Sequence, residues 1–313
     1  MSKIISIVTP CFNEETNVQE CYETVRKIFE RDLPGYDYEH IFCDNDSSDR
    51  TPVILRDIAQ KDSRIKIILN SRNFGPFQSL FNGLRRTCGD ATIVCLVADL
   101  QDPPQLIPEF VREWEKGYDI VYGVRAKRKE PFYLAGLRRL YYKLISGWSQ
   151  IDIPRHAGEF QLIDRRVRDV LCTFQDRSPF IRGMIAACGF KKIGIEYEMA
   201  ERERGVSKSK LYTLIDLGLI GLTSMSIFPL RLMIFMGTAI SLLSILVAFF
   251  TVIVGLIQFR SFAPAGIPML ISGLFFFSGL NLLFLGILGE YMAAIYHQVL
   301  SRPLVIEKEL INF

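Results

Sequence analysis

Short apolar runs alternate with amphipathic segments along the first part of the chain. The expected buried strands are Ile4–Pro10, Tyr38–Cys43, Ile65–Leu69, Ala91–Val97 and Asp119–Gly123. Segments with helical spacing of apolar residues lie between them: one ending near Arg31, then Thr51–Lys61, Phe77–Thr87 and Gln105–Lys116. Strands and helices that alternate at such short intervals predict an α/β domain with a mostly parallel sheet and helices on both faces.

Polar residues follow the first four apolar runs, in the stretches FNEE, DNDSSD, NSRN and ADLQD. Ligands of open α/β sheets bind at the carboxyl ends of the strands, so we expect a site built from these four stretches. In the fourth, Asp99, Gln101 and Asp102 precede Pro103 and Pro104, which stop the strand. Such oxygen ligands suit a hard divalent cation that carries phosphates, although a plain polar loop fits this stretch, taken alone, equally well.

The pattern is less regular after Gly123. A basic stretch leads to an expected helix near Tyr133–Gln150, and the segment HAGEFQLIDRR follows. Helices near Arg165–Thr173 and Pro179–Cys188, then a strand Lys191–Tyr197, precede the basic loop AERERGVSKSK.

Two long uncharged runs follow that loop. There are 28 residues between Arg231 and Arg260 and 29 between Arg260 and Glu290, and none of them is charged. Each run exceeds the roughly 20 residues that cross a bilayer core. We therefore expect transmembrane helices near Leu232–Phe259 and Pro268–Gly289, with a buried helical hairpin of a soluble protein as the alternative.

These patterns divide the chain into four parts. We expect a cytosolic α/β domain over residues 1–210, an interfacial amphipathic helix over 211–230, the two spans within 231–290, and a cytosolic tail over 291–313. Arg231, Arg302 and Lys308 flank the spans on one side and Arg260 on the other, which favours cytoplasmic termini in a multi-pass protein of the inner (plasma) membrane.

Composition adds two restrictions. The chain of 313 residues is 49% hydrophobic, and its formal net charge of +3 gives no reason to expect a nucleic-acid partner. Its seven cysteines are scattered without a CxxC pair, so we expect them to be reduced, as in a cytosolic domain.

The order of the motifs resembles that of glycosyltransferase family 2, of GT-A (Rossmann-like) fold, and within it the polyprenyl-phosphate glycosyltransferases. These include dolichyl-phosphate mannose synthase and bacterial enzymes that load glucose or aminoarabinose onto undecaprenyl phosphate. The stretches that carry the resemblance are VTPCFNEE, CDNDSSDRT, NSRNFG, ADLQDPP, GEFQLIDRR, RGVSKSK and LGEYMAAIYHQVLSRP. They span nearly the whole chain in the family's order.

The resemblance implies roles for residues at each strand end. The nucleotide-sugar site would comprise Pro10, Phe12, Asn13, Glu14, Asp44 at the base, Arg72 and Gln101. Asp99 holds the position of the last aspartate of the family's DAD signature, which binds Mg²⁺ or Mn²⁺, and Gln101 matches its helper glutamine. Glu159 matches an acidic residue near the sugar and is the candidate for orienting the acceptor or acting as a general base, with capping of a strand or pairing with an arginine as the structural alternative.

The chain departs from the family pattern at three positions. Val97 replaces the first aspartate of the DAD signature, Asn45 replaces the second aspartate of the usual DDGS motif, and Asp46 replaces its glycine. The change at Val97 implies weakened or altered donor binding and leaves open an inactive relative.

Acceptor chemistry follows from general principles. A lipid phosphate has a second pKa of about 6, so it is already nucleophilic at pH 7 and needs orientation and charge balance more than a strong base. Arginine and lysine at the membrane face supply both. The candidates are Arg125, Arg128, Arg138, Arg202 and Lys208, with attraction to anionic lipid headgroups as the alternative role.

Together these features predict an inverting transferase. It would move one sugar from a UDP-sugar, UDP-glucose or another UDP-hexose, to undecaprenyl phosphate at the cytoplasmic membrane face, for modification of a cell-envelope glycan. The family resemblance also implies membrane lipids as partners and admits a homo-oligomer, which is a tetramer in relatives. The rival readings are a catalytically weakened scaffold or nucleotide-sugar binder, and a processive polysaccharide synthase, whose QxxRW motif neither Trp114 nor Trp148 matches.

Overall fold

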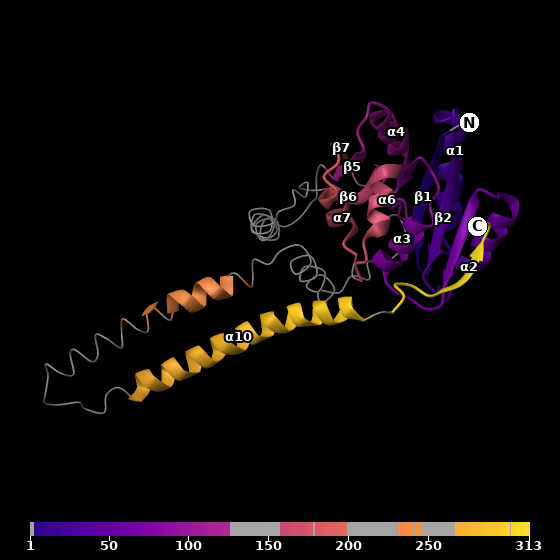
Figure 1. The fold of residues 1–313 in the computed structure, drawn as a ribbon. Coiled ribbons are helices and arrows are strands. Elements are labelled where there is room, and N and C mark those ends of the chain that lie inside the picture. Colours follow the sequence, from indigo (N-terminus) through magenta and orange to yellow (C-terminus); the bar gives the residue numbers. More distant parts are fainter. Residues whose placement is uncertain are drawn as a thin grey trace, which may run out of the picture.

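The computed structural model describes residues 3–125, 157–177, 179–198, 230, 232–240, 242–243, 246, 267–300 and 302–313. Within them, the α/β domain is built on one eight-stranded sheet of order β7-β5-β6-β4-β1-β2-β3-β8 (Figure 1). The parallel strands are β1 (Lys3–Cys11), β2 (Tyr36–Asp44), β3 (Ile65–Asn70), β4 (Ala91–Ile93), β5 (Ile120–Arg125) and β7 (Lys192–Tyr197). Two strands, β6 (Ala157–Asp164) and β8 (Glu307–Ile311), run antiparallel to their neighbours. The predicted mostly parallel sheet is confirmed.

Helices cover both faces of this sheet. One apolar core packs α1 (Val18–Asp32), α2 (Thr51–Lys61) and α4 (Ile107–Glu115) on one face. A second core packs α3 (Pro76–Arg85), α6 (Arg165–Thr173) and α7 (Ile181–Ala187) on the other. All seven cysteines are free, and three of the four buried ones, Cys11, Cys43 and Cys95, lie in or beside strands, where they serve as small apolar residues.

The strand before the Asp99 loop is shorter than predicted. It was expected to run over Ala91–Val97, but the ladder of β4 ends at Ile93. The following backbone still lies in the sheet, because Val94 N–H donates to the Gln161 carbonyl (2.8 Å) and Leu96 N–H to the Val8 carbonyl (3.0 Å). The chain then turns sharply at Leu100, whose φ of +54° places a bulky side chain in the left-handed region.

Of the two expected spans, the structure describes one long helix. α10 (Ile267–Val299) has 33 residues and contains the second predicted span, and its stretch Phe276–Tyr296 is, within the described residues, the one helix long and apolar enough to cross a membrane. The expected first span, near Leu232–Phe259, and the expected interfacial helix over 211–230 lie mainly outside the described residues.

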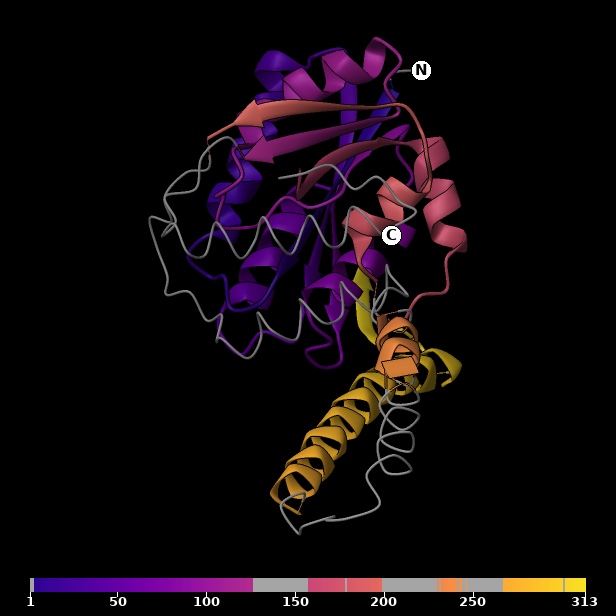
Figure 2. The ribbon, with the colours of Figure 1, turned by 90° about the vertical axis from the view of Figure 1, so that its left-hand side faces the viewer.

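The C-terminal segment is more structured than the expected tail over 291–313. Its first residues continue α10 to Val299, and its last form β8 at the edge of the sheet, paired with β3. Figures 1 and 2 show that the last residues of α10 lie beside the domain and its first residues lie far from it. The chain after α10 returns to the sheet as β8.

Candidate functional site

The polar stretches meet at one edge of the sheet. Cys11 pairs with Asp44, and Asp44 with Leu69, so the first three parallel strands end side by side. β6 runs antiparallel to β4 and β5, so its first residues reach the same edge. The predicted site residues that lie in the described part of the chain are therefore gathered at this edge.

The first two loops are joined by hydrogen bonds. Asn13 N–H donates to Ser47 Oγ (2.8 Å), and the Asn13 Oδ1 accepts from Ser48 N–H (2.8 Å). Glu14 N–H donates to Thr51 Oγ1 (2.9 Å). These bonds hold Asn13 in a left-handed conformation (φ +56°), which asparagine tolerates better than most residues. The side chain of Asn13 thus holds the loop together, while Phe12 beside it is 39% exposed.

Asp44 ends β2 with a buried carboxylate. Its side chain is 2% exposed, its Oδ2 accepts from Ser47 N–H (3.1 Å), and its Oδ1 has no hydrogen-bond partner within the described residues. Burial raises the pKa of Asp44 against the lowering effect of the Ser47 hydrogen bonds. A buried acceptor without a donor is costly, so a ligand that brings an N–H here would be stabilised.

The side chain of Asn45 forms hydrogen bonds with three other residues. Its Oδ1 accepts from Asn70 Nδ2 (3.0 Å) and Phe74 N–H (3.1 Å), and its Nδ2 donates to the Gly75 carbonyl (2.9 Å). An aspartate could not donate to that carbonyl. The departure from the family's second aspartate therefore fixes the loop that leads into α3. The other departure, Asp46, occupies a left-handed position (φ +62°), which explains why the family pattern has glycine there.

Asp99 and Gln101 form the loop after β4. Asp99 is half-buried, and its Oδ1 accepts from Gln101 N–H at 3.3 Å. The described residues contain no group of three or more histidine, cysteine or acidic side chains placed to hold a metal. A divalent cation nevertheless fits Asp99 and Gln101, because Mg²⁺ commonly takes one or two protein ligands and completes its shell with phosphates and water.

Val97 packs where the family pattern has an aspartate. It is half-buried against the core that contains α3, α6 and α7. Arg72, in the loop after β3, is exposed and stacks on Phe74, with 3.9 Å from its guanidinium carbon to the ring centroid.

Glu159 faces Arg182 near the first residues of β6. The Glu159 Oε1 lies 4.0 Å from Arg182 Nε, a long ion pair, and Glu159 Oε2 is buried without a hydrogen-bond partner within the described residues. Burial raises the pKa of Glu159, opposed by the charges of Arg182 and Arg125. A carboxylate with raised pKa and an uncommitted oxygen suits a proton acceptor.

Arg125, predicted to contact a lipid phosphate, also binds two side chains of the protein. Its Nη2 lies 3.1 Å from both carboxylate oxygens of Asp102, and its Nε donates to the Tyr197 hydroxyl (3.1 Å). Neither Asp102, as an ion-pair partner, nor Tyr197 was identified from the sequence. The other acceptor candidates, Arg128, Arg138, Arg202 and Lys208, lie outside the described residues.

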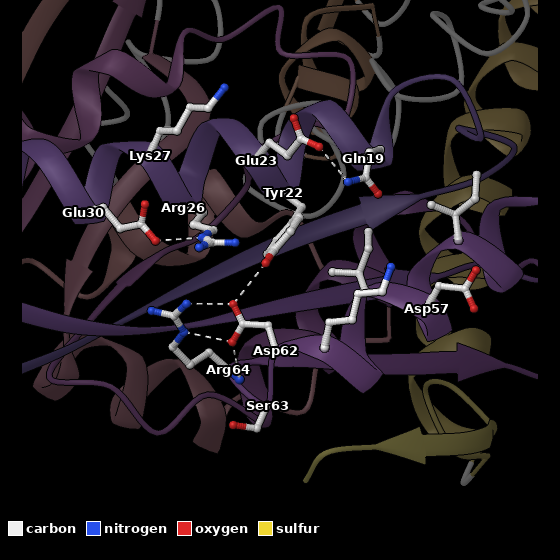
Figure 3. A pocket seen from close by; sticks show the side chains of 13 residues that line it. Gln19, Tyr22, Glu23, Arg26, Lys27, Glu30, Asp57, Asp62, Ser63 and Arg64 are labelled. Atoms are coloured by element: carbon white, nitrogen blue, oxygen red, sulfur yellow. Dashed lines mark hydrogen bonds and ion pairs between the residues drawn. The ribbon is translucent and has the colours of Figure 1, made fainter.

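A groove of about 840 Å³ lies elsewhere, between α1 and α2 (Figure 3). Of its eight charged side chains, four form ion pairs within it, Arg26 with Glu30 (2.7 Å) and Arg64 with Asp62 (2.8 Å), and the Tyr22 hydroxyl donates to Asp62 (3.2 Å). Four acidic and four basic side chains balance one another in charge, as on a solvated surface, and the groove takes no part in the site at the strand ends.

Comparisons with known proteins find one matching family and relatives similar over nearly the whole chain. Residues 6–171 match the family described as Glycosyl transferase family 2. The uncharacterized glycosyltransferase YkcC of Bacillus subtilis (strain 168) is 39% identical over 302 residues, which cover 96% of this chain and 92% of that protein. The SfII prophage-derived bactoprenol glucosyl transferase of Shigella flexneri is 34% identical over 306 residues, 97% of each chain.

Solved structures show a more distant similarity. The mannosyltransferase PcManGT from Pyrobaculum calidifontis, in complex with GDP-Man and Mn²⁺, covers 97% of this chain and 89% of its own, at 16% identity and a TM-score of 0.45. Glucosyl-3-phosphoglycerate synthase from Mycobacterium tuberculosis, in complex with Mn²⁺, UDP-glucose and phosphoglyceric acid, covers 70% of this chain and 79% of its own, at 17% identity and a TM-score of 0.44. Similarity at this level transfers no ligand to this chain.

Proposed function

The chain belongs to glycosyltransferase family 2, and we propose that it transfers one sugar from a nucleotide diphosphate sugar to polyprenyl phosphate at a membrane surface. The choice of a polyprenyl phosphate acceptor rests on the near-full-length similarity to proteins named bactoprenol glucosyl transferase. The long apolar helix α10, attached to the same sheet that holds the site, agrees with a lipid acceptor.

The donor in this proposal is a UDP-sugar, with UDP-glucose the first choice. Asp44 Oδ1 would accept the imino N–H of uracil, which would satisfy the buried oxygen. Arg72 is exposed beside Phe74 and offers a guanidinium to the nucleotide. Uridine and guanine both carry such an N–H, so the choice of uridine rests on the bacterial relatives.

Asp99 and Gln101 would hold a Mg²⁺ or Mn²⁺ ion on the diphosphate. When bound, the ion supplies positive charge against the departing nucleoside diphosphate. Asp99 keeps its carboxylate aimed by accepting from Gln101 N–H, and the turn at Leu100 sets the direction of both residues.

Attack comes from the acceptor side. A lipid phosphate attacks the anomeric carbon, the bond to the nucleoside diphosphate breaks, and the product is a polyprenyl monophosphosugar of inverted configuration. Glu159 takes the role of orienting the acceptor or of accepting its remaining proton, and Arg125 that of balancing its charge. We place this site on the cytoplasmic side.

The test uses membranes that contain the full-length protein. They are incubated with undecaprenyl phosphate, Mg²⁺ or Mn²⁺, and a panel of labelled UDP- and GDP-sugars, and the extracted lipid is analysed for label. We expect labelled lipid with one UDP-hexose. Absence of labelled lipid with every donor would refute the proposal, and label from a GDP-sugar alone would refute the choice of uridine.

A further inference from the structure

Asp102, Arg125 and Tyr197 form a closed hydrogen-bonded triad. Arg125 Nη2 lies 3.1 Å from each oxygen of Asp102, Arg125 Nε donates to the Tyr197 hydroxyl, and that hydroxyl donates to Asp102 Oδ1. The Asp102 side chain is only 4% exposed. A buried carboxylate with both oxygens paired and hydrogen-bonded is rigid, and removing one partner leaves an uncompensated charge.

The surrounding backbone leaves room for this triad. A Cβ atom on Gly123 would lie 2.6 Å from Cε1 of the Tyr197 ring, so only glycine fits there without displacing the ring. A Cβ on Gly158, the residue before Glu159, would lie 3.5 Å from both Arg125 Nε and the Tyr197 hydroxyl. The triad therefore packs directly against the backbone that carries Glu159.

Two carboxylates near the Asp99 loop thus have different surroundings. Asp102 is fully committed to Arg125 and Tyr197, whereas Glu159 is 4.0 Å from Arg182 and keeps a buried oxygen without a hydrogen-bond partner in the described part of the chain. Both oxygens of Asp102 accept hydrogen bonds within the triad, and these bonds set the direction in which the Arg125 guanidinium points.

We propose that Asp102 is a positioning residue of the transfer reaction, which fixes the Arg125 guanidinium beside Glu159 for contact with the acceptor phosphate. This rests on the proposed function. Asp102 lies three residues after Asp99, so the loop that holds the donor diphosphate also sets the direction of the acceptor's cation. Tyr197 completes the link by tying the end of the edge strand β7 to the same carboxylate.

The test compares three variants of the full-length protein in membranes. Asp102→Asn keeps the shape but turns an N–H₂ group toward Arg125, and Tyr197→Phe removes one hydroxyl and keeps the ring. Glu39→Gln is the matched control. Glu39 is also a buried acidic residue, 4% exposed and paired with Lys66 (2.6 Å), but it lies in the first half of β2, away from the carboxyl ends of the strands. The measurements are KM for undecaprenyl phosphate, the Kd for UDP, and amide hydrogen exchange at residues 195–198.

We expect Asp102→Asn to raise the acceptor KM by about tenfold or more, the loss expected for a charged hydrogen bond, with the Kd for UDP changed less than about twofold. Tyr197→Phe should shift KM in the same direction by a smaller factor, and both should speed exchange at residues 195–198. Glu39→Gln should leave KM and that exchange unchanged.

Three results would overturn the positioning role. These are an unchanged acceptor KM in both site variants, an effect confined to the Kd for UDP, or exchange at residues 195–198 as slow as in the wild type. Where Asp102→Asn does not fold, Tyr197→Phe decides alone. A wild-type protein that transfers no sugar to undecaprenyl phosphate would instead refute the proposed function, and the exchange measurement, which needs no substrate, separates the two failures.

Discussion

Glu307 and Glu309 are two residues apart on β8, yet their carboxylates bind arginines on opposite faces of the sheet. Glu307 accepts from Arg86 (2.7 Å), the residue after α3, and Glu309 accepts from Arg56 (2.5 Å) of α2. The register of the β8–β3 pairing shifts between Leu69 and Asn70, because Leu69 pairs with Glu309 and Asn70 with Glu307. This irregularity lets Glu307 and Glu309 point to opposite faces of the sheet. β8 is thereby clamped to both helix layers.

The two halves of this clamp differ in exposure and in hydrogen-bond partners. Glu307 is 18% exposed and also accepts from Asn82 (2.8 Å), whereas Glu309 is 41% exposed. We expect Glu307→Ala to lower the free energy of unfolding by about 1–2 kcal/mol, and Glu309→Ala to lower it less. Urea unfolding of the detergent-solubilised protein measures both. Glu30→Ala, which removes the exposed Arg26–Glu30 pair, is the control, and a loss there as large as for Glu307 would contradict the clamp.

Asp99→Asn should abolish turnover without unfolding the protein. The substitution keeps the shape of a half-buried side chain but removes the charge that a divalent cation requires. We expect a loss of at least about 100-fold in kcat, the scale on which removal of an electrostatic group acts, with Tm unchanged. A variant that keeps wild-type turnover would show that the carboxylate holds no cation needed for the reaction.

Asp44→Asn should weaken nucleotide binding. The amide can still accept from Ser47 N–H, but the side chain loses the charge, and one of its two oxygens becomes an N–H₂ group that would face the donor on the base. We expect the Kd for UDP to rise about 10- to 100-fold, as for a lost charged hydrogen bond. Calorimetric titration with UDP measures this, and equal binding by the variant would exclude Asp44 from the nucleotide site.

Glu159→Gln should raise stability and remove activity. Burial raises the pKa of Glu159 above its usual 4.5, so the folded state holds the proton more tightly than the unfolded state. The free energy of unfolding therefore falls as the pH rises from 4.5 through the folded-state pKa, and the ionised side chain is destabilising at neutral pH. The neutral variant should lack this fall.

Thermal unfolding at several pH values tests that sign. We expect a higher Tm for Glu159→Gln at pH 7, where about 2–4 °C corresponds to about 1 kcal/mol, and a smaller difference at pH 4. Transfer to the lipid phosphate should fall in the same variant. A lower Tm at pH 7 would mean that the pair with Arg182 is net stabilising and that Glu159 has a structural role.

Local pattern was sufficient for most of the fold. The spacing of apolar residues predicts α2 and α6 at their observed limits, and β1, β2 and β3 to within two residues. β6 was missed because Glu159 and Gln161 interrupt its apolar pattern, and they do so because that strand carries part of the site. β8 was missed because it is short and charged, as edge strands commonly are, and its partner lies far away in the sequence.

Some residues of the candidate site could be predicted from the sequence, and others could not. Asp99, Asp44 and Glu159 stand in short motifs, and sequence alone singles them out. Asp102 and Tyr197 are 95 residues apart. The parallel pairing of β5 with β7 places Tyr197 opposite Arg125, and Arg125 in turn reaches Asp102 in the loop after β4, so their meeting depends on the assembled sheet. The function of Asn45 was also invisible, because a replacement inside a motif does not show which carbonyl the new amide will bind.

The position of β8 in the chain also sets an order of assembly. β3 ends at Asn70 and its outer neighbour begins at Glu307, so the intervening residues, α10 among them, are synthesised before that edge can be paired. At about 5–20 residues per second, the wait is on the order of tens of seconds. During it β3 presents unpaired backbone groups, the feature by which strands aggregate. Completion of the sheet is thus tied to completion of α10, and a chain that ends within that helix would leave β3 with an open edge.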